Sequence, residues 1–96
     1  MSQSVVFKFR LYTAANTHNS AQALANLTAL CQFHLLNRHE IEVVDVFREP
    51  QRALADGVRM TPTLLKLAPF PAQKIVGTLN ETARIVQILG LADFAA

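Results

Sequence analysis

Residues 60–67 read Met-Thr-Pro-Thr-Leu-Leu-Lys-Leu, and this stretch decides how the rest of the chain is interpreted. A proline that follows a threonine directly before an apolar strand is typical of a cis peptide bond in a tight turn, which is predicted here for Thr61 and Pro62. The strand predicted over 64–68 is followed by a second short apolar run at 73–78. Prolines bracket the turn between the two runs, so an antiparallel hairpin is expected.

The part of the chain before this stretch alternates strand and helix patterns. Val5 to Tyr12 carries apolar residues at its odd positions, which is the period of a strand. Asn19 is predicted to cap a helix that runs from Ser20 to about Asn37. Ile41 to Phe47 is apolar almost throughout, which favours a strand buried on both faces, as parallel strands usually are.

Two further helices are predicted on either side of the hairpin. Pro50 suits the first turn of a short helix that Gly57 terminates, because glycine accepts the left-handed conformation that ends helices. Asn80 is predicted to cap the last helix, with Ile88 on its inner face and Gly90 at its end. The expected order is therefore βαβαββα, an α/β fold in a single domain.

Composition limits the function classes. With 96 residues, of which 51% are hydrophobic and 17% charged, the chain is expected to fold around one core, residues 1–96, and to gain from self-association. Its net charge of +2 is scattered, so neither nucleic acid nor a membrane surface is predicted as a partner. The sequence shows no leader pattern and no run long enough to cross a membrane, and a cytoplasmic location is expected.

The chemistry-bearing residues predict neither catalysis nor metal binding. Cys31, the single cysteine, lies within the apolar stripe of the long helix and is interpreted as a core residue. His18, His34 and His39 lack the close pairing that zinc sites need. Asp45, in a mostly apolar strand, has no evident partner base for proton transfer. No cofactor is predicted.

The element order, together with the threonine-proline turn, resembles the thioredoxin fold. In thioredoxins the start of the long helix, opposite that turn, carries C-x-x-C, where the helix start lowers the pKa of a thiol. Here the corresponding residues are Asn16-Thr17-His18-Asn19. Neither asparagine nor histidine replaces a thiol in disulfide exchange, so redox activity is not expected.

The pattern leaves open whether Tyr12, at the end of the first strand, is an interface anchor or an amphipathic residue at the edge of the sheet.

At a finer level the sequence resembles the KaiB family over nearly the whole chain. Three stretches carry the resemblance. They are Leu11-Tyr12 with Asn16-Thr17, Asn19-Ser20 and Ala23-Leu24; Val43 to Val46 with Pro50-Gln51; and Thr61 to Leu64 with Lys66, Pro69, Pro71, Lys74-Ile75 and Gly77.

The resemblance implies a non-enzymatic timing protein that binds a KaiC-type hexameric ATPase ring and modulates its phosphorylation cycle. It further implies a KaiA-like or histidine-kinase partner, and exchange between a thioredoxin-like monomer and a ground-state fold that self-associates to a dimer or tetramer. The implied partner-binding residues are Glu42, Gly57 and Lys66. Glu42 and Gly57 stand where the family often has lysines. The implied structural and fold-switching residues are Thr61, Pro62, Ile88 and Gly90.

Other interpretations stay open at this stage. A degenerate thioredoxin-like or glutathione-binding protein fits the same element order, and so does a sensory domain of a histidine kinase. The departures from the family pattern also suit a stress-response adaptor of a divergent Kai system. Ile88 completes an apolar helix face but suits a strand as well, so the resting fold is not decided by the sequence.

Overall fold

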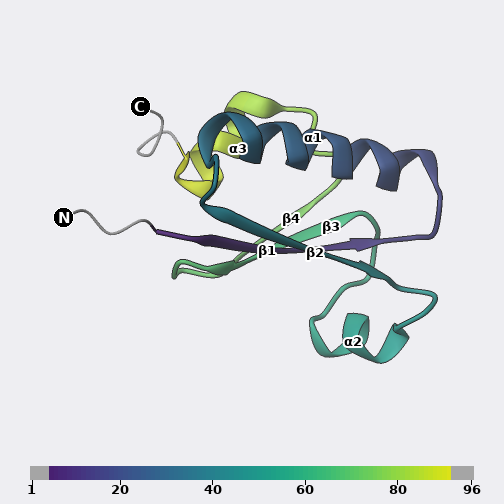
Figure 1. Ribbon diagram of the computed structural model, residues 1–96. Helices are drawn as coiled ribbons and strands as arrows, with labels where there is room; N and C mark the ends of the chain where they lie inside the picture. Colours follow the sequence, from purple (N-terminus) through teal and green to yellow (C-terminus); the bar gives the residue numbers. More distant parts are fainter. Residues whose placement is uncertain (1–4, 92–96) are drawn as a thin grey trace.

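The computed structural model describes residues 5–91, in which one mixed sheet carries helices on both faces. Helices α1 and α3 cover one face of the sheet and the short α2 lies against the other (Figure 1). The elements are β1 (Phe7–Thr13), α1 (His18–His34), β2 (His39–Asp45), α2 (Pro50–Ala55), β3 (Thr63–Ala68), β4 (Gln73–Val76) and α3 (Thr82–Leu89). The predicted order βαβαββα and the α/β thioredoxin-like fold class are confirmed.

The sheet has the strand order β2-β1-β3-β4. Strand β1 pairs in parallel with β2, to which α1 connects it, and antiparallel with β3. Strands β3 and β4 form the predicted antiparallel hairpin. Among residues 5–91 the two edges of the sheet are therefore β2 and β4.

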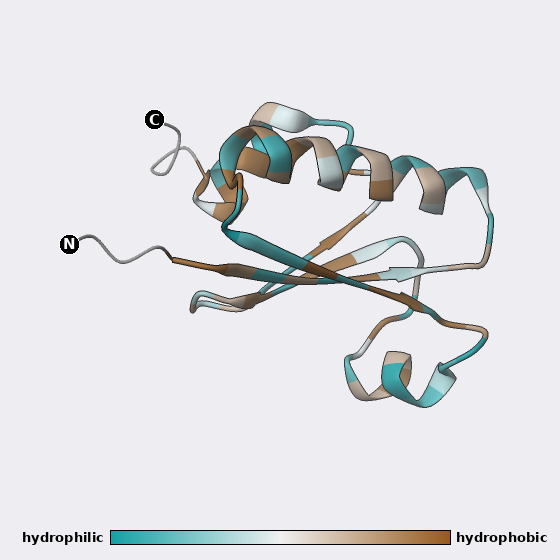
Figure 2. Ribbon diagram, viewed as in Figure 1, coloured by the Kyte–Doolittle hydropathy of each residue, from teal (hydrophilic) through white to brown (hydrophobic). Residues whose placement is uncertain are grey.

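The main core lies between the sheet and helices α1 and α3. Alternate residues of β1, Phe7, Phe9 and Leu11, point into it, as the odd-position pattern predicts. Cys31 of α1 is also completely buried there. Figure 2 shows the same arrangement as apolar segments along the central strands and pale or polar turns on the outside of α1.

The long helix starts earlier than predicted, and Asn19 does not cap it. The N-cap is Thr17, whose side chain accepts a hydrogen bond from the Ser20 amide at 3.4 Å. Both residues are good caps, so the tertiary position of the preceding loop decides between them. The helix ends at His34 rather than near Asn37, because its C-cap, Leu35, leaves the helical conformation with a φ of −134°. Asn37 then takes a left-handed φ of 63°.

Strand β2 is not buried on both faces, which corrects the interpretation of 41–47. It lies at an edge of the sheet and only Val44 in it is buried, while Val43 is 47% exposed. An apolar run is compatible with a central or an edge strand, and the neighbour that would have covered its outer side is not present in residues 5–91.

The termini of the other helices agree with the sequence in part. Gly90 ends α3 with a left-handed φ of 73°, as predicted, and Gly57 follows α2 with a φ of 69°. Asn80 is not the cap of α3: the N-cap is Glu81, which makes no side-chain capping bond. The Thr61-Pro62 peptide is cis, as predicted.

Candidate partner-binding surface

The start of α1 and the Thr61-Pro62 turn lie at the same end of the molecule. Ala14, just before α1, and Thr61 line one shallow hollow. The turn is closed by the Thr63 hydroxyl, which donates to the Met60 carbonyl at 2.6 Å, and by the Gly77 amide, which donates to the Pro62 carbonyl at 2.9 Å. A hydrogen-bonded turn thus lies beside the segment that leads into α1, in the arrangement that the resemblance to thioredoxins implies for a thiol site.

No thiol is present in this arrangement. The single cysteine, Cys31, is completely buried within α1, and burial raises the pKa of its thiol to about 12. The nucleophilic form of cysteine is the thiolate, so this side chain is chemically inert at neutral pH. Asn16, Thr17, His18 and Asn19 are exposed in the place of a thiol pair.

Cys31→Ser is expected to leave disulfide-reductase assays at the background of the native chain and to lower stability by about 1 kcal/mol. A serine hydroxyl inside an apolar core costs about 1–3 kcal/mol when it is unpaired, but in a helix it can donate to the carbonyl four residues earlier. Chemical denaturation and an insulin-reduction assay measure the two quantities. A redox turnover that the native chain has and Cys31→Ser lacks would contradict this interpretation of the site.

The hollow at this end has exposed apolar side chains beside it. Phe47 and Met60 flank it and are 71% and 64% exposed. Arg48 and Arg59 are also exposed and form no ion pair within residues 5–91. The complete lining is Ala14, Val46, Phe47, Ala53, Val58, Arg59, Met60 and Thr61. Two large apolar side chains beside two free cations suit a protein surface that offers apolar and acidic groups.

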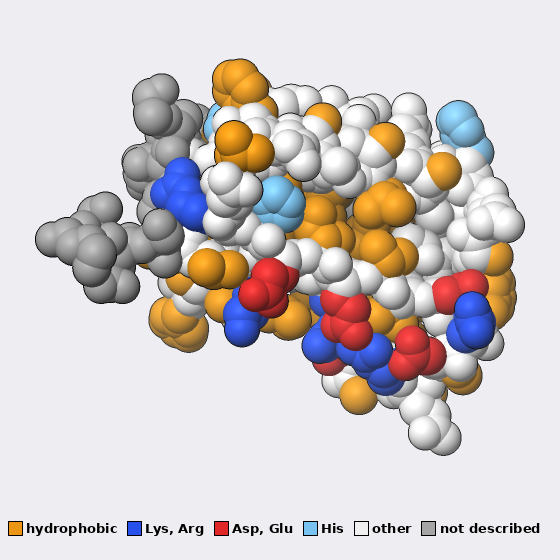
Figure 3. Space-filling view, in the orientation of Figure 1, with side chains coloured by type: hydrophobic (Ala, Val, Ile, Leu, Met, Phe, Trp, Pro, Cys, Tyr) orange, Lys and Arg blue, Asp and Glu red, His pale blue; other side chains and the backbone are white. Residues whose placement is uncertain are grey.

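A chain of ion pairs links α2 to the sheet beside the hollow. The Arg10 guanidinium donates to Glu42 at 2.8 Å and lies 2.9 Å from the Asp56 carboxylate. Arg52 of α2 reaches the other oxygen of Glu42 at 2.8 Å and Glu49 at 3.2 Å. In Figure 3 charged side chains of both signs gather along the lower part of the molecule, below α1.

Tyr12 lies beneath this network and is completely buried, so it is neither an exposed interface anchor nor an edge residue. Its hydroxyl donates to Asp56 at 2.5 Å and lies 3.1 Å from the Arg52 carbonyl. Burial, and then the Asp56 hydrogen bond, raise the pKa of Tyr12. The Tyr12 hydrogen bond, and then the Arg10 guanidinium, hold the pKa of Asp56 below its ordinary value. The pKa of Glu42 is lowered by its bonds to Arg10 and Arg52.

Two of the three predicted partner-binding residues lie around α2. Glu42 takes part in the ion-pair chain, with 47% of its side chain exposed. Gly57 follows α2 and its carbonyl accepts a bond from Lys74 at 3.1 Å. A side chain at Gly57 would start 3.2 Å from the Lys74 ammonium, so Lys74 supplies a positive charge close to this position.

Lys66 is not brought together with Glu42 and Gly57. It lies on the opposite face of the sheet, 4% exposed, with its ammonium 5.6 Å from the centre of the Phe7 ring. Burial lowers the pKa of this amine. In the fold described here Lys66 is a covered residue rather than part of an open surface.

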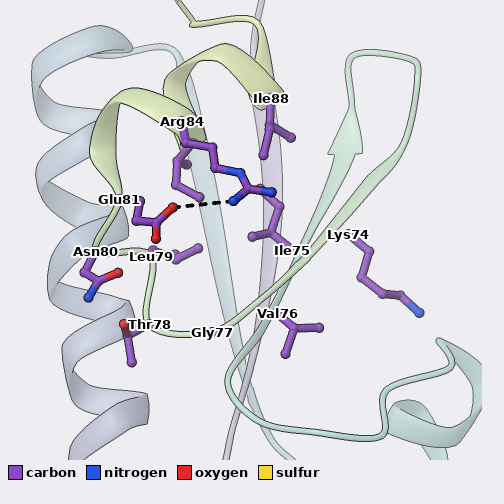
Figure 4. Close-up of a pocket in the computed structure, with 11 residues that line it drawn as sticks. Lys74, Ile75, Val76, Gly77, Thr78, Leu79, Asn80, Glu81, Arg84 and Ile88 are labelled. Carbon is purple, nitrogen blue, oxygen red and sulfur yellow. Dashed lines mark ion pairs between the residues drawn. The ribbon is translucent and has the colours of Figure 1, made fainter.

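A larger hollow lies elsewhere, between β4 and α3, and has a volume of about 620 Å³. Figure 4 shows Ile75 and Leu79 directed toward α3 and Lys74 extending away from it. Ile88 lines the groove and is half-buried, and an exposed Arg84–Glu81 pair at 3.6 Å spans its rim. The groove combines in its lining the apolar side chains of Ile75, Leu79 and Ile85 with polar ones from β4 and the start of α3. It marks where α3, with the predicted residues Ile88 and Gly90, rests on the sheet.

Residues 5–91 contain neither a metal-binding cluster nor a membrane-spanning helix. No group of three or more His, Cys, Asp or Glu side chains there is placed to hold a metal ion. In the same part of the chain no helix combines the length and apolar character needed to cross a bilayer.

Sequence reasoning missed Phe47, Met60 and the Tyr12–Asp56 pair. A signal for the first two existed, since Phe47 is the last residue of the strand predicted over 41–47, Met60 lies between predicted elements, and each stands next to an arginine. The Tyr12–Asp56 pair joins residues 44 positions apart and has no local signature.

A family model and curated relatives match most of the chain by sequence. The KaiB domain model matches residues 10–91. The chain is 40% identical over 82 residues to the "Circadian clock protein KaiB3" of Synechocystis sp., which covers 85% of this chain and 78% of that protein. It is 34% identical over 86 residues to the "Circadian clock oscillator protein KaiB" of Synechococcus elongatus, which covers 90% of this chain and 84% of that protein.

Solved structures share the fold at low identity. The N-terminal domain of Synechococcus elongatus SasA superposes with a TM-score of 0.74 at 16% identity, over 97% of this chain and 89% of that domain. Chloroplastic thioredoxin z gives a TM-score of 0.73 at 19% identity, over 92% of this chain and 79% of that one. At such identities the likeness establishes the fold alone.

Proposed function

Because the chain belongs to the KaiB family, we propose that it is a non-enzymatic clock or timing protein that binds a KaiC-type ATPase ring and modulates the ring's phosphorylation cycle. The observation that carries the proposal is the set of side chains exposed at the end of the molecule where thioredoxins hold their thiols. In place of a thiol pair this chain exposes residues 16–19, and the hollow at the same end presents Phe47 and Met60 beside Arg48 and Arg59. These side chains suit binding and offer no nucleophile.

The proposed contact surface is centred on the hollow and extends to α2. Phe47 and Met60 supply the apolar centre, and Gly57 and Glu42 lie toward its rim. In this fold Lys66 contributes only after a rearrangement that uncovers the other face of β3, since it is 4% exposed. The same surface is proposed for a KaiA-like or histidine-kinase partner, which would then compete with the ring.

A second, self-associated fold is part of the proposal. The core of this chain is small, and two packings of one sequence interconvert when they differ by only a few kcal/mol. Residues Thr61 and Pro62, at the turn before the hairpin, and Ile88 and Gly90, at the end of α3, are proposed to take part in the exchange.

The proposal predicts that the tagged chain retains the KaiC-type ring of its own organism from purified components, slowly and in a nucleotide-dependent manner. Pull-down and interferometry with the ring in ATP and in ADP measure this, and phosphorylation of the ring with and without the chain measures the output. Absence of binding in both nucleotides would remove the assignment. Retention on glutathione resin, with competition by free glutathione, would instead favour a glutathione-binding protein.

A further inference from the structure

Helix α2 is attached to the sheet with very little apolar burial. It has six residues, of which only Ala53 is buried, and Leu54 is 76% exposed. Helices this short are not stable on their own in water and need tertiary contacts. The attachment of α2 must therefore come mainly from polar contacts.

Those polar contacts converge on Asp56, the C-cap residue of α2. Its carboxylate accepts the Tyr12 hydroxyl at 2.5 Å and the Arg10 guanidinium at 2.9 Å, and both partners belong to β1. Glu42 of β2 then connects Arg10 to Arg52, back on α2. The ring of contacts runs from α2 to β1, to β2, and again to α2.

The residues beneath α2 form a small second core. It consists of the buried residues Tyr12, Val44, Ala53 and Leu65, with Val46 and Val58 packed against it. Three of the four buried members come from the sheet and one from α2. Movement of α2 away from the sheet would expose this apolar face without opening the larger core on the other side.

We propose that α2 is a lid held on the sheet by charge, and that Asp56 is the positioning residue that keeps it closed. Closed, the lid holds Ala53 and Val58 in the wall of the hollow; open, it uncovers Tyr12, Val44 and Leu65. The effect on partner binding rests on the proposed function, whereas the lid itself does not.

The electrostatics give the lid a defined response to salt and acid. Asp56 faces Arg10 and Tyr12 of β1, Arg52 of its own helix and Glu42 of β2, and Lys74 of β4 binds the carbonyl of the following residue, Gly57. Because the pKa values of Asp56 and Glu42 are lowered in the folded state, their contribution is present at neutral pH. It is lost as the pH falls below the ordinary range of carboxyl groups and through these lowered pKa values, and it is weakened by salt.

The test compares Asp56→Asn, which keeps the shape of the side chain and removes its charge, with Glu81→Gln, which removes a carboxylate from an exposed pair on α3. Amide hydrogen exchange followed by NMR reports on the Gly57 and Val58 amides, which bond to the Leu54 and Ala53 carbonyls. We expect Asp56→Asn to lower the protection of these amides about tenfold or more and to change β1 amides less than twofold. Glu81→Gln should change neither set, and 0.5 M NaCl should act on the native chain in the same direction as Asp56→Asn.

Equal protection of the Gly57 and Val58 amides in the native chain and Asp56→Asn would overturn the proposal, as would a uniform loss over α2 and β1. If Asp56→Asn does not fold, Tyr12→Phe removes one hydrogen bond to Asp56 while the aromatic side chain stays in the core. The protection of the Gly57 and Val58 amides in this variant then tests the proposal. Binding of the KaiC-type ring is measured on the same samples. A native chain that binds no ring while its α2 amides respond as expected would contradict the proposed function and leave the lid intact.

Discussion

The double substitution Phe47→Glu, Met60→Glu is expected to weaken binding of the KaiC-type ring by at least a hundredfold without altering the fold. Both side chains are mostly exposed, at 71% and 64%, so their replacement leaves the core untouched. Anchor residues at the centre of an interface contribute about 2 kcal/mol or more each, and tenfold in affinity corresponds to about 1.4 kcal/mol. A carboxylate at either position adds the cost of removing a charge from water.

The matched control for this experiment is Phe70→Glu. Phe70 is 92% exposed in the turn between β3 and β4, at the end of the sheet opposite to the hollow. It undergoes the same chemical change and should keep native affinity. Interferometry with the immobilised ring measures the three chains, and circular dichroism confirms that each is folded. Native affinity in the double variant, or an equal loss in Phe70→Glu, would place the contact surface elsewhere.

The elements that the sequence predicts well are those with a strong local period. Strand β1 has apolar residues at alternate positions, and the hairpin is marked by two apolar runs separated by prolines, so neither depends on knowing the neighbours. The left-handed glycines at positions 57 and 90 are predicted for the same reason, since the conformation belongs to one residue.

The errors concern properties that depend on distant parts of the chain. The residues of β2 alone do not indicate whether it is a central or an edge strand. Because β2 lies at an edge, Val43 is exposed rather than buried. Asn19 is as good a cap as Thr17, and the path of the preceding loop decides between them. The bond of Arg10 to Asp56 joins residues 46 positions apart, so only the fold reveals that these charges are paired.

The candidate site was predicted in part for the same reasons. Its frame, the helix start and the cis-proline turn, follows from local motifs. Which side chains are available for binding depends on which surfaces stay exposed after folding. Phe47 stays exposed, whereas Lys66 is buried.

Ile88→Gly is expected to destabilise the described fold by about 2 kcal/mol and to shift any equilibrium with a second fold about thirtyfold away from it. Glycine lowers helix propensity by about 1 kcal/mol. Because Ile88 is half-buried in the groove against β4, its removal also loses about half of the 1.5–3 kcal/mol that a fully buried isoleucine contributes. Size-exclusion chromatography should show a larger oligomer, and amide NMR a second set of signals.

Ala83→Gly separates propensity from packing in this experiment. Ala83 is exposed on the same helix, so its replacement by glycine costs the propensity of about 1 kcal/mol and no burial. A bistable chain should respond to both variants in proportion to these costs, with the smaller shift in Ala83→Gly. If both variants melt at lower denaturant concentration but keep one elution volume and one set of signals at every concentration, α3 is a fixed element. The chain would then bind its partner in the thioredoxin-like fold alone, with no slow exchange to delay the contact.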